Sequence, residues 1–284
     1  MTDVRWRWLR RCVATVSLAA LALVPLSDVP DDPPEGGLRT VIAAPTADRT
    51  RTPWQITALG DSVTAGSNCD CTAFPALYAA DLAAADDRTV AVTNGGQAGA
   101  TSDDLLDELR DPSDPVGSAI SASELVVVTI GANDFADQHD QVEAGDCGDP
   151  DDLQCARAGL AHLHDTLAAI LAEITTLRRG RSTAVLVTGY WNVFEDGDTA
   201  VQAYPAAGIS ASRDLTVAVN NVEREVAANH RDIYVDLFRP FVGADGMSDP
   251  TGLLAADGDH PNAKGHQAIA AALLAAGVAP LPVG

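Results

Sequence analysis

The sequence predicts an α/β domain in which a parallel β-sheet lies buried between two layers of helices. Five short apolar runs rich in β-branched residues recur along the chain, and each is continuous rather than alternating, as is typical of strands buried on both faces. Helical patterns separate these runs, and polar residues suited to chemistry follow them. Such alternation is typical of a three-layer α/β/α sandwich, which binds its ligands at the carboxyl ends of the strands.

The expected strands share this continuous apolar character and lie at residues 55–59, 90–93, 125–130, 184–188 and 233–237. The expected helices lie between or after them, at residues 75–85, 102–110, 153–177, 213–229 and 262–275. Pro75 suits the first turn of its helix, where a backbone N–H has no partner. The longest helix has apolar residues three or four apart, which predicts a face packed on the sheet: Leu153, Ala156, Leu160, Leu163, Leu167, Ile170, Ile174 and Leu177.

Length and composition indicate one globular domain preceded by a linker. The chain has 284 residues, of which 46% are hydrophobic, so residues 53–284 suffice for one domain with a sizeable core. Residues 28–52 are rich in Pro, Asp, Gly and Thr without periodicity, which predicts a disordered linker.

Residues 1–27 have the pattern of an export signal. Four arginines precede an apolar run at residues 12–26: Arg5, Arg7, Arg10 and Arg11. The run is short for a membrane span, but an uncleaved anchor stays open because no small-x-small cleavage site follows promptly. The general secretory route is expected, and Arg10-Arg11 adds a twin-arginine route. Either route predicts a secreted, extracellular protein.

The charge balance argues against nucleic-acid partners and anionic membrane surfaces. The chain has 40 acidic and 18 basic residues, a formal net charge of −22, and Lys264 is its single lysine. Such a surface repels phosphate backbones and anionic headgroups. The expected partner is a small-molecule, lipid or polysaccharide substrate, with no membrane partner beyond a possible N-terminal anchor. One chain does not fix an oligomeric state, and a monomer is the expectation.

Beyond Cys12 in the export segment, four cysteines remain: Cys69, Cys71, Cys147 and Cys155. An even count in an exported chain predicts disulfides, and the spacing without a nearby histidine does not match a zinc site. Of three possible pairings we favour Cys147 with Cys155, which leaves Cys69 with Cys71 in a strained small ring or partly reduced. The chain-entropy model gives the favoured bridge about 2.6 kcal/mol.

Polar residues follow four of the predicted strands, where ligands bind in such sheets. Gly60-Asp61-Ser62 alone is ordinary turn chemistry, but the far end of the chain supplies Asp257 and His260, three residues apart. A serine hydroxyl is a weak nucleophile until a base accepts its proton, and histidine is the natural base near neutral pH. Asp257 would then fix the tautomer of His260.

An oxyanion in such a reaction needs donors that are already in place, and three are available. The backbone N–H groups of Ser62 and Gly99 and the side-chain amide of Asn133 could supply them, although Gly95 and Gly96 follow the same strand as Gly99 and any of the three could be a plain turn glycine. Three other polar residues have supporting roles, with Asp61 capping its turn and Asn94 and Asp134 bracing the loops. No metal and no organic cofactor is needed for this chemistry.

Four sequence blocks in this order resemble the SGNH hydrolases of the GDSL esterase and lipase family. They are Gly60-Asp61-Ser62-Val63, where Val replaces the Leu of the motif, Asn94-Gly95-Gly96-Gln97-Ala98-Gly99, Gly131-Ala132-Asn133-Asp134 and Asp257-Gly258-Asp259-His260-Pro261. The resemblance implies a nucleophile at Ser62, oxyanion donors at Gly99 and Asn133, and Asp257 and His260 as the rest of the triad. It also implies the flavodoxin-like strand order 2-1-3-4-5 and a secreted bacterial type of serine esterase or lipase.

Several alternatives stay open at this point. Asp259 competes with Asp257, although a residue adjacent to the histidine rarely points at its ring. The substrate is a lipid or short-chain ester, or an acetylated polysaccharide, and a non-catalytic glycan-binding protein is the remaining alternative. Five aromatic residues follow later strands and either line a pocket or pack in the core: Trp191, Phe194, Tyr204, Phe238 and Phe241.

Overall fold

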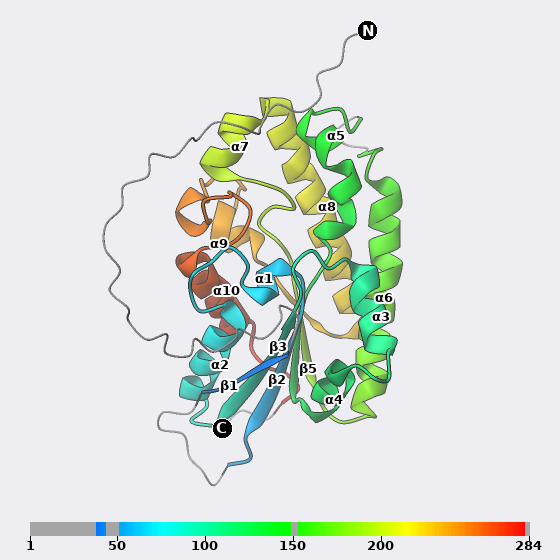
Figure 1. Cartoon of the computed structure of the whole chain (residues 1–284), viewed down its shortest axis with the longest axis vertical. Coiled ribbons are helices and arrows are strands. Elements are labelled where there is room, and N and C mark those ends of the chain that lie inside the picture. The colour runs from blue at the N-terminus through cyan, green and yellow to red at the C-terminus, as the bar shows by residue number, and fades with distance from the viewer. Residues whose placement is uncertain (1–37, 44–50, 149–152, 282–284) are drawn as a thin grey trace, which may run out of the picture. The chain divides into compact units, whose positions relative to one another are not determined.

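The computed structural model describes residues 38–43, 51–148 and 153–281. They form a twisted sheet with helices on both faces (Figure 1). The predicted export signal and most of the predicted linker lie outside these residues, so both stay predictions. Within the described ranges, no helix combines the length and apolar character that a membrane span requires.

The sheet has six strands in the order β1-β3-β2-β4-β5-β6. Their bounds are β1 Arg39–Ala43, β2 Trp54–Gly60, β3 Val90–Gly96, β4 Leu125–Thr129, β5 Ala184–Thr188 and β6 Ile233–Val235. The last five are parallel, and β1 pairs antiparallel with β3. Numbered among themselves, the parallel strands follow the order 2-1-3-4-5, which confirms the predicted fold class and strand order.

Strand β1 corrects the predicted five-stranded sheet, and it lies inside the segment predicted as a linker. It occupies the free edge of β3, which would otherwise present unpaired backbone groups to solvent. Val41 and Ile42 stay 49% and 69% exposed, so the strand buries little apolar surface. A strand held mainly by backbone hydrogen bonds leaves a weak hydrophobic pattern, and for that reason the sequence did not predict it.

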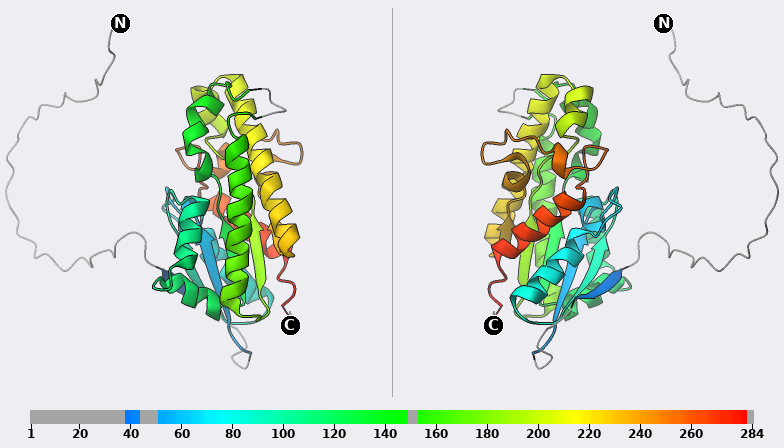
Figure 2. Two further views of the ribbon diagram at one scale, coloured as in Figure 1. Left: turned by 90° about the vertical axis from the view of Figure 1, so that its right-hand side faces the viewer. Right: turned by 90° about the vertical axis from the view of Figure 1, so that its left-hand side faces the viewer.

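Two layers of helices cover the sheet (Figures 1 and 2). One layer contains α2 Phe74–Ala85 and α10 Ala263–Ala276, and the other contains α3 Ser102–Arg110, α4 Pro115–Ala122, α6 Arg157–Arg178 and α8 Ala206–His230. The shorter helices lie in connections: α1 Ser62–Ala65, η1 Asn133–Gln138, α5 His139–Glu143, α7 Gly197–Ala203, α9 Phe238–Val242 and η2 Thr251–Leu253. Most of these follow strands and gather beyond the carboxyl ends of the sheet.

Two long helices begin at other residues than predicted. Helix α6 begins at Arg157 because the residues before it form a turn, in which Leu153 has φ +40° and the Cys155 N–H bonds to the Cys147 carbonyl. Helix α8 begins at Ala206, directly after Pro205, whose fixed φ is compatible with a helix start. The predicted apolar face of α6 is buried, with Leu163, Leu167, Ile170 and Ile174 fully inaccessible.

Both predicted disulfides are present. Cys69 joins Cys71, and Cys147 joins Cys155, with Cα atoms 5.1 and 4.9 Å apart. The first ring lies between α1 and α2, and the second closes the loop before α6.

Candidate active site

The register of three neighbouring strands brings the predicted site residues to one edge. Gly60 at the end of β2 lies opposite Gly96 of β3 on one side and Thr129 of β4 on the other. The Asp61 N–H donates to the Thr129 carbonyl at 3.1 Å, which continues the pairing past the strand end. Ser62, Gly99 and Asn133 therefore each follow one of three adjacent strand ends by a few residues.

A glycine at position 60 allows the turn that presents Ser62. Gly60 has φ +138°, and a Cβ atom there would lie 1.9 Å from the Thr129 carbonyl oxygen, so no other residue fits. Asp61 then caps α1, because its Oδ1 atom accepts from the Val63 N–H at 2.9 Å. Ser62 is the half-buried first residue of this helix.

The Asp61 carboxyl is buried beneath this turn and accepts a second hydrogen bond from the Tyr190 hydroxyl. Burial raises the pKa of Asp61 to about 6, against the opposing effect of the bonds from Tyr190 and Val63. The predicted capping contact is therefore present, and the structure adds Tyr190 as its buried partner.

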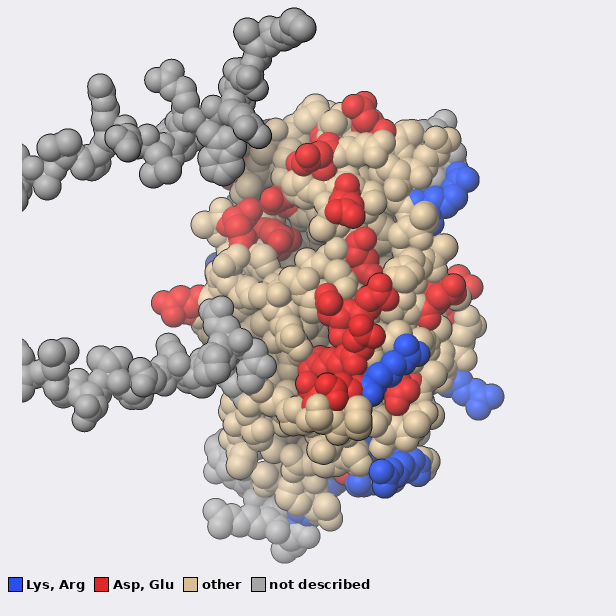
Figure 3. Space-filling model, turned by 45° about the vertical axis from the view of Figure 1, so that its right-hand side comes forward, with Lys and Arg blue, Asp and Glu red and all other residues tan. Residues whose placement is uncertain are grey.

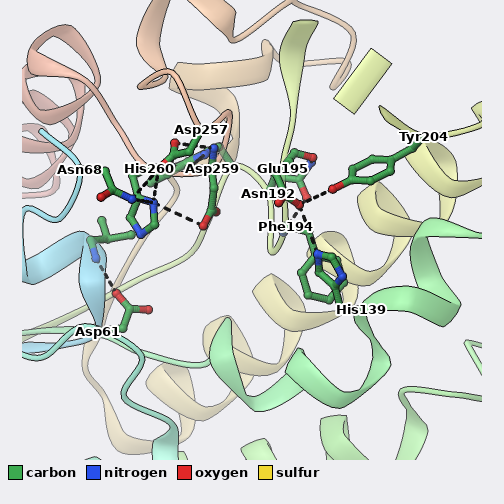
Figure 4. Close-up of polar contacts among 12 residues, drawn as sticks. Asp61, Asn68, His139, Asn192, Phe194, Glu195, Tyr204, Asp257, Asp259 and His260 are labelled. Atoms are coloured by element: carbon green, nitrogen blue, oxygen red, sulfur yellow. Dashed lines mark hydrogen bonds and ion pairs between the residues drawn. The ribbon is translucent and has the colours of Figure 1, made fainter. Parts of the chain in front are cut away.

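Asp257 and His260 form a hydrogen-bonded pair in the loop before α10 (Figure 4). His260 Nδ1 lies 2.8 Å from Asp257 Oδ2 and 3.5 Å from Asp259 Oδ2, so geometry favours Asp257 as its partner. Burial alone would raise the pKa of Asp257, but hydrogen bonds from the Asp259 and His260 backbone, the His260 ring and Asn68 lower it below its usual value. An ionised Asp257 accepts the Nδ1 proton and leaves Nε2 free to act as a base.

Ser62 and His260 lie at the same end of the sheet but are not hydrogen-bonded. Among the described residues, no hydrogen bond joins the Ser62 hydroxyl to the imidazole. Asn68, in the loop that follows α1, contacts both Asp257 and His260, and this contact brings the serine loop against the histidine loop. Catalytic hydrogen bonds are often long without substrate and tighten when it binds.

Asn133 and Gly99, the other two residues predicted to supply oxyanion donors, follow β4 and β3. One N–H of the Asn133 amide donates to the Ala100 carbonyl at 2.9 Å, which fixes the plane of the amide and leaves its second N–H available. Gly99 is exposed, has φ +78° and has open space where a Cβ atom would lie. The backbone there is accessible to a small ligand.

The two loop residues have contacts of the kind that bracing requires. The Asn94 amide donates to the Thr64 carbonyl at 2.8 Å and accepts from the Gly96 N–H at 2.9 Å, which ties β3 to α1. Asp134 accepts from the backbone N–H and the hydroxyl of Ser102, which ties the loop after β4 to the start of α3.

Comparison of the sequence with models of protein families identifies the family of this chain. The model of the GDSL-like lipase/acylhydrolase family matches residues 58–268. The chain belongs to this family. It is accordingly a carboxylic ester hydrolase of the GDSL type. No curated protein sequence matches the chain significantly.

Solved structures of other hydrolases share the fold of this GDSL-like hydrolase. The lipase Lip_vut3 from a goat rumen metagenome is 18% identical and has a TM-score of 0.61, over 79% of this chain and 97% of its own. Phospholipase A1 from Streptomyces albidoflavus NA297 is 22% identical, with a TM-score of 0.58 over 79% of this chain and 99% of its own. The acetylxylan esterase Axe2 from Geobacillus stearothermophilus is 20% identical, with a TM-score of 0.56 over 78% and 93%.

A cavity of about 490 Å³ adjoins Asn133 in the GDSL-like hydrolase, and its walls are mostly polar. His139, Phe194, Glu195 and Asp259 are among its lining residues. His139 packs edge-on against Phe194 with ring centres 4.7 Å apart, and its Nε2 atom lies 3.3 Å from Glu195. Figure 4 shows this group opposite the Asp257–His260 pair. A larger cavity, about 580 Å³, lies between α3, α4 and the end of α6, and none of the predicted catalytic residues lines it.

The sequence left open whether the aromatic residues after the later strands line a pocket or pack in the core, and the structure shows both roles. Phe194 lines the cavity beside Asn133. Trp191 and Phe241 are buried and stack on each other with ring centres 4.3 Å apart. The Tyr204 hydroxyl donates to Glu195 at 2.6 Å, next to the cavity.

Two groups of side chains in the described part of the chain lie close enough to share a cation. In the first, Cys69 and Cys71 are joined as a disulfide, so His266 is the one remaining ligand. In the second, His139 Nε2 lies 2.6 Å from Glu143, and the third member, Asp140, is fully exposed. Neither has the donor set of a transition-metal centre as it stands.

Three residues of the site were not predicted from the sequence: Asn68, Tyr190 and Glu223. Glu223 is fully buried on α8, and its carboxyl oxygens have no hydrogen-bond partner among the described residues. Burial, with nearby Asp61 adding to it, raises the pKa of Glu223 well above its usual value, which favours the neutral carboxyl. Its position four residues after Val219 and three before Val226, on a buried face, is the signal that would have found it.

Acidic side chains are more numerous in this chain than basic ones, 40 against 18. Figure 3 shows them in a band along one face, with Lys and Arg at fewer positions.

Proposed function

We propose that this chain is a serine esterase that forms an acyl-enzyme on Ser62. His260 Nε2 accepts the Ser62 proton as the hydroxyl attacks the ester carbonyl, and then gives that proton to the departing alcohol. Water attacks the acyl-enzyme by the same route and releases the acid. The observation that carries the proposal is the 2.8 Å hydrogen bond between His260 Nδ1 and Asp257 Oδ2. This bond favours the tautomer in which Nε2 is the base, at the edge of the sheet where Ser62 lies.

The oxyanion hole in this proposal consists of the Ser62 and Gly99 backbone N–H groups and the second N–H of Asn133. These donors follow β2, β3 and β4, three neighbours in the sheet, so the rigid core fixes their spacing. Donors that are in place before the reaction stabilise the developing oxyanion without reorganisation.

The lining of the cavity beside Asn133 favours a substrate in which a short acyl chain is esterified to a polar alcohol. Its lining includes His139, Glu195 and Asp259 and a single large aromatic side chain, Phe194. A long acyl chain would remove water from these carboxylates without offering them hydrogen bonds, which is unfavourable. An ester on a hydroxyl-rich alcohol, such as an acetylated sugar, leaves the carboxylates with donors, so a carbohydrate acetyl esterase is the second candidate function.

Export of the enzyme is part of the proposal. The predicted signal at residues 1–27 motivates it, and the two disulfides of the domain are typical of proteins outside the cytoplasm. In this arrangement residues 53–284 form the catalytic domain. Strand β1, at residues 39–43, pairs with the edge of its sheet.

Substitution of Ser62 tests the proposed function. Ser62→Ala is expected to abolish hydrolysis of a short acyl nitrophenyl ester while the thermal melt stays close to that of the parent chain. Ser67→Ala is the matched control, since Ser67 lies just after the helix that Ser62 begins and contacts Ser62 through its backbone N–H, which donates to the Ser62 carbonyl at 2.9 Å. Hydrolysis by Ser62→Ala at the parent rate would rule out the acyl-enzyme, and binding of glycans by a hydrolytically inert parent chain would favour a binding protein.

A further inference from the structure

The loop between α1 and α2, residues 66–73, joins both halves of the proposed catalytic machinery. At its start the Ser67 N–H donates to the carbonyl of Ser62 at 2.9 Å. At its end the Phe74 N–H donates to His266 Nδ1 at 3.2 Å, on the helix that follows the His260 loop. The loop is therefore anchored to the nucleophile at one side and to α10 at the other.

Asn68 lies midway along this loop and touches the catalytic pair (Figure 4). Its amide N–H donates to Asp257 Oδ2 at 2.6 Å, and the same nitrogen lies 3.2 Å from His260 Nδ1. The residue has φ +56°, a left-handed conformation that asparagine adopts more readily than most other residues. This backbone conformation directs the amide at the carboxylate that orients His260.

A disulfide begins directly after Asn68. The Cys69–Cys71 bridge closes a ring of three residues, which leaves the backbone next to Asn68 few alternative conformations. Both of its cysteines are half-buried, as is Cys155 of the other bridge, whereas Cys147 is only 2% exposed. Neither cysteine of the ring beside Asn68 is fully buried, so a thiol in solution can attack either of its sulfur atoms.

We propose that Asn68 is a positioning residue for the Asp257–His260 pair, and that the Cys69–Cys71 disulfide is a thiol-sensitive modification site that holds Asn68 in place. The inference rests on the proposed function, because it concerns the base of that reaction. Opening the ring frees residues 69–71, Asn68 leaves the carboxylate, and turnover falls.

The modifying reagent is a dithiol. One of its thiolates attacks a Sγ atom of the bridge, the S–S bond breaks, and a mixed disulfide forms. The second thiol of the reagent then displaces the remaining cysteine. Two electrons and two protons pass to Cys69 and Cys71, which become thiols, and the reagent becomes a disulfide.

Substitution of Asn68 tests the positioning role. Asn68→Gly keeps the left-handed backbone accessible and removes the amide, and it is expected to lower kcat by about 10- to 100-fold through misplacement of the base, with little change in KM. Asp70→Asn is the matched control, because Asp70 is an exposed residue inside the same ring. A kcat for Asn68→Gly equal to that of the control would overturn the positioning role.

The leaving group separates a positioning role from a structural one. A nitrophenolate departs without a proton, whereas an alkoxide needs the proton that His260 holds. Asn68→Gly is therefore expected to lose more activity on an ethyl ester than on a nitrophenyl ester of the same acid. Equal losses on both esters would indicate a general loss of structure and contradict the proposal.

Reduction of the full chain tests the disulfide. With increasing dithiol, kcat is expected to fall about tenfold or more in step with alkylation of Cys69 and Cys71, identified by mass spectrometry. The variant Cys147→Ser/Cys155→Ser should lose activity over the same range of dithiol concentration as the parent chain. The variant Cys69→Ser/Cys71→Ser should have the low kcat of the reduced chain from the start, and added dithiol should not lower it further. Full activity in a chain with Cys69 and Cys71 alkylated would overturn the proposal that this disulfide holds Asn68 in place.

The two proposals fail in different ways. If Ser62→Ala keeps its activity, the proposed function itself is wrong. If Ser62→Ala is inactive but Asn68→Gly and Cys69→Ser/Cys71→Ser hydrolyse both esters at the parent rate, the catalytic assignment stands and the positioning inference alone is wrong.

Discussion

Replacing Asn133 with alanine removes one of the three proposed oxyanion donors. One of its N–H groups is held by the Ala100 carbonyl at 2.9 Å, so the other has a fixed direction before substrate binds. Loss of one such donor costs about 3 kcal/mol of transition-state stabilisation, which corresponds to a decrease of about 150-fold in kcat. KM is expected to change little, because the negative charge on the carbonyl oxygen develops only in the transition state.

The cost to folding is much smaller than the cost to catalysis. Asn133→Ala leaves the Ala100 carbonyl without this partner, which is worth about 1 kcal/mol and lowers Tm by about 2–4 °C. Steady-state kinetics on a short acyl nitrophenyl ester give kcat and KM, and a thermal melt gives Tm. A kcat within about threefold of the parent, in a chain that melts as expected, would refute the role of Asn133 as an oxyanion donor.

Three further predictions concern the histidine partner, a buried carboxyl and a disulfide. Asp257→Asn is expected to lower kcat by about 10³- to 10⁴-fold and Asp259→Asn by less than about tenfold, and equal losses in ester assays would contradict the assignment. Because burial raises the pKa of Glu223, the folded chain keeps a proton that the unfolded chain loses, so the free energy of unfolding falls as pH rises above about 4.5, the usual pKa of this carboxyl. Glu223→Gln should flatten this slope in denaturant titrations, and an unchanged slope would be inconsistent with a buried neutral carboxyl. Cys147→Ser/Cys155→Ser should lower the free energy of unfolding by about 2.6 kcal/mol, against about 1.6 kcal/mol for the shorter Cys69–Cys71 ring, and the reverse order would contradict the chain-entropy argument.

The sequence was informative wherever a pattern repeats along the chain. The parallel strands are buried on both faces, so their apolar runs are continuous, as in β4 and β5, where every residue is buried. The polar residues after those strands fall at the carboxyl edge because parallel strands all end there. The contact between Asp257 and His260 was predictable because the two residues are three apart.

The contacts that the sequence did not predict join distant segments or lack a pattern. Asn68 and Asp257 are 189 residues apart, and nothing in the local sequence of either residue indicates the other. Tyr190 reaches Asp61 across 129 residues. Strand β1 exposes Val41 and Ile42 and pairs with β3 mainly through its backbone, so its hydrophobic pattern is weak. The polar cavity beside Asn133 is lined by three segments that are far apart in the sequence, so it could not be predicted without the fold.

The central claim is that Ser62 is the nucleophile, and a covalent probe tests it most directly. A fluorophosphonate reacts with a serine only when a base removes the proton of its hydroxyl, and it leaves a stable adduct. Peptide mass spectrometry of the labelled full chain is expected to place this adduct on Ser62, with no labelling in Ser62→Ala. An active chain that forms no adduct on Ser62, or that is labelled on another serine such as Ser67 and loses its activity with it, would contradict the account.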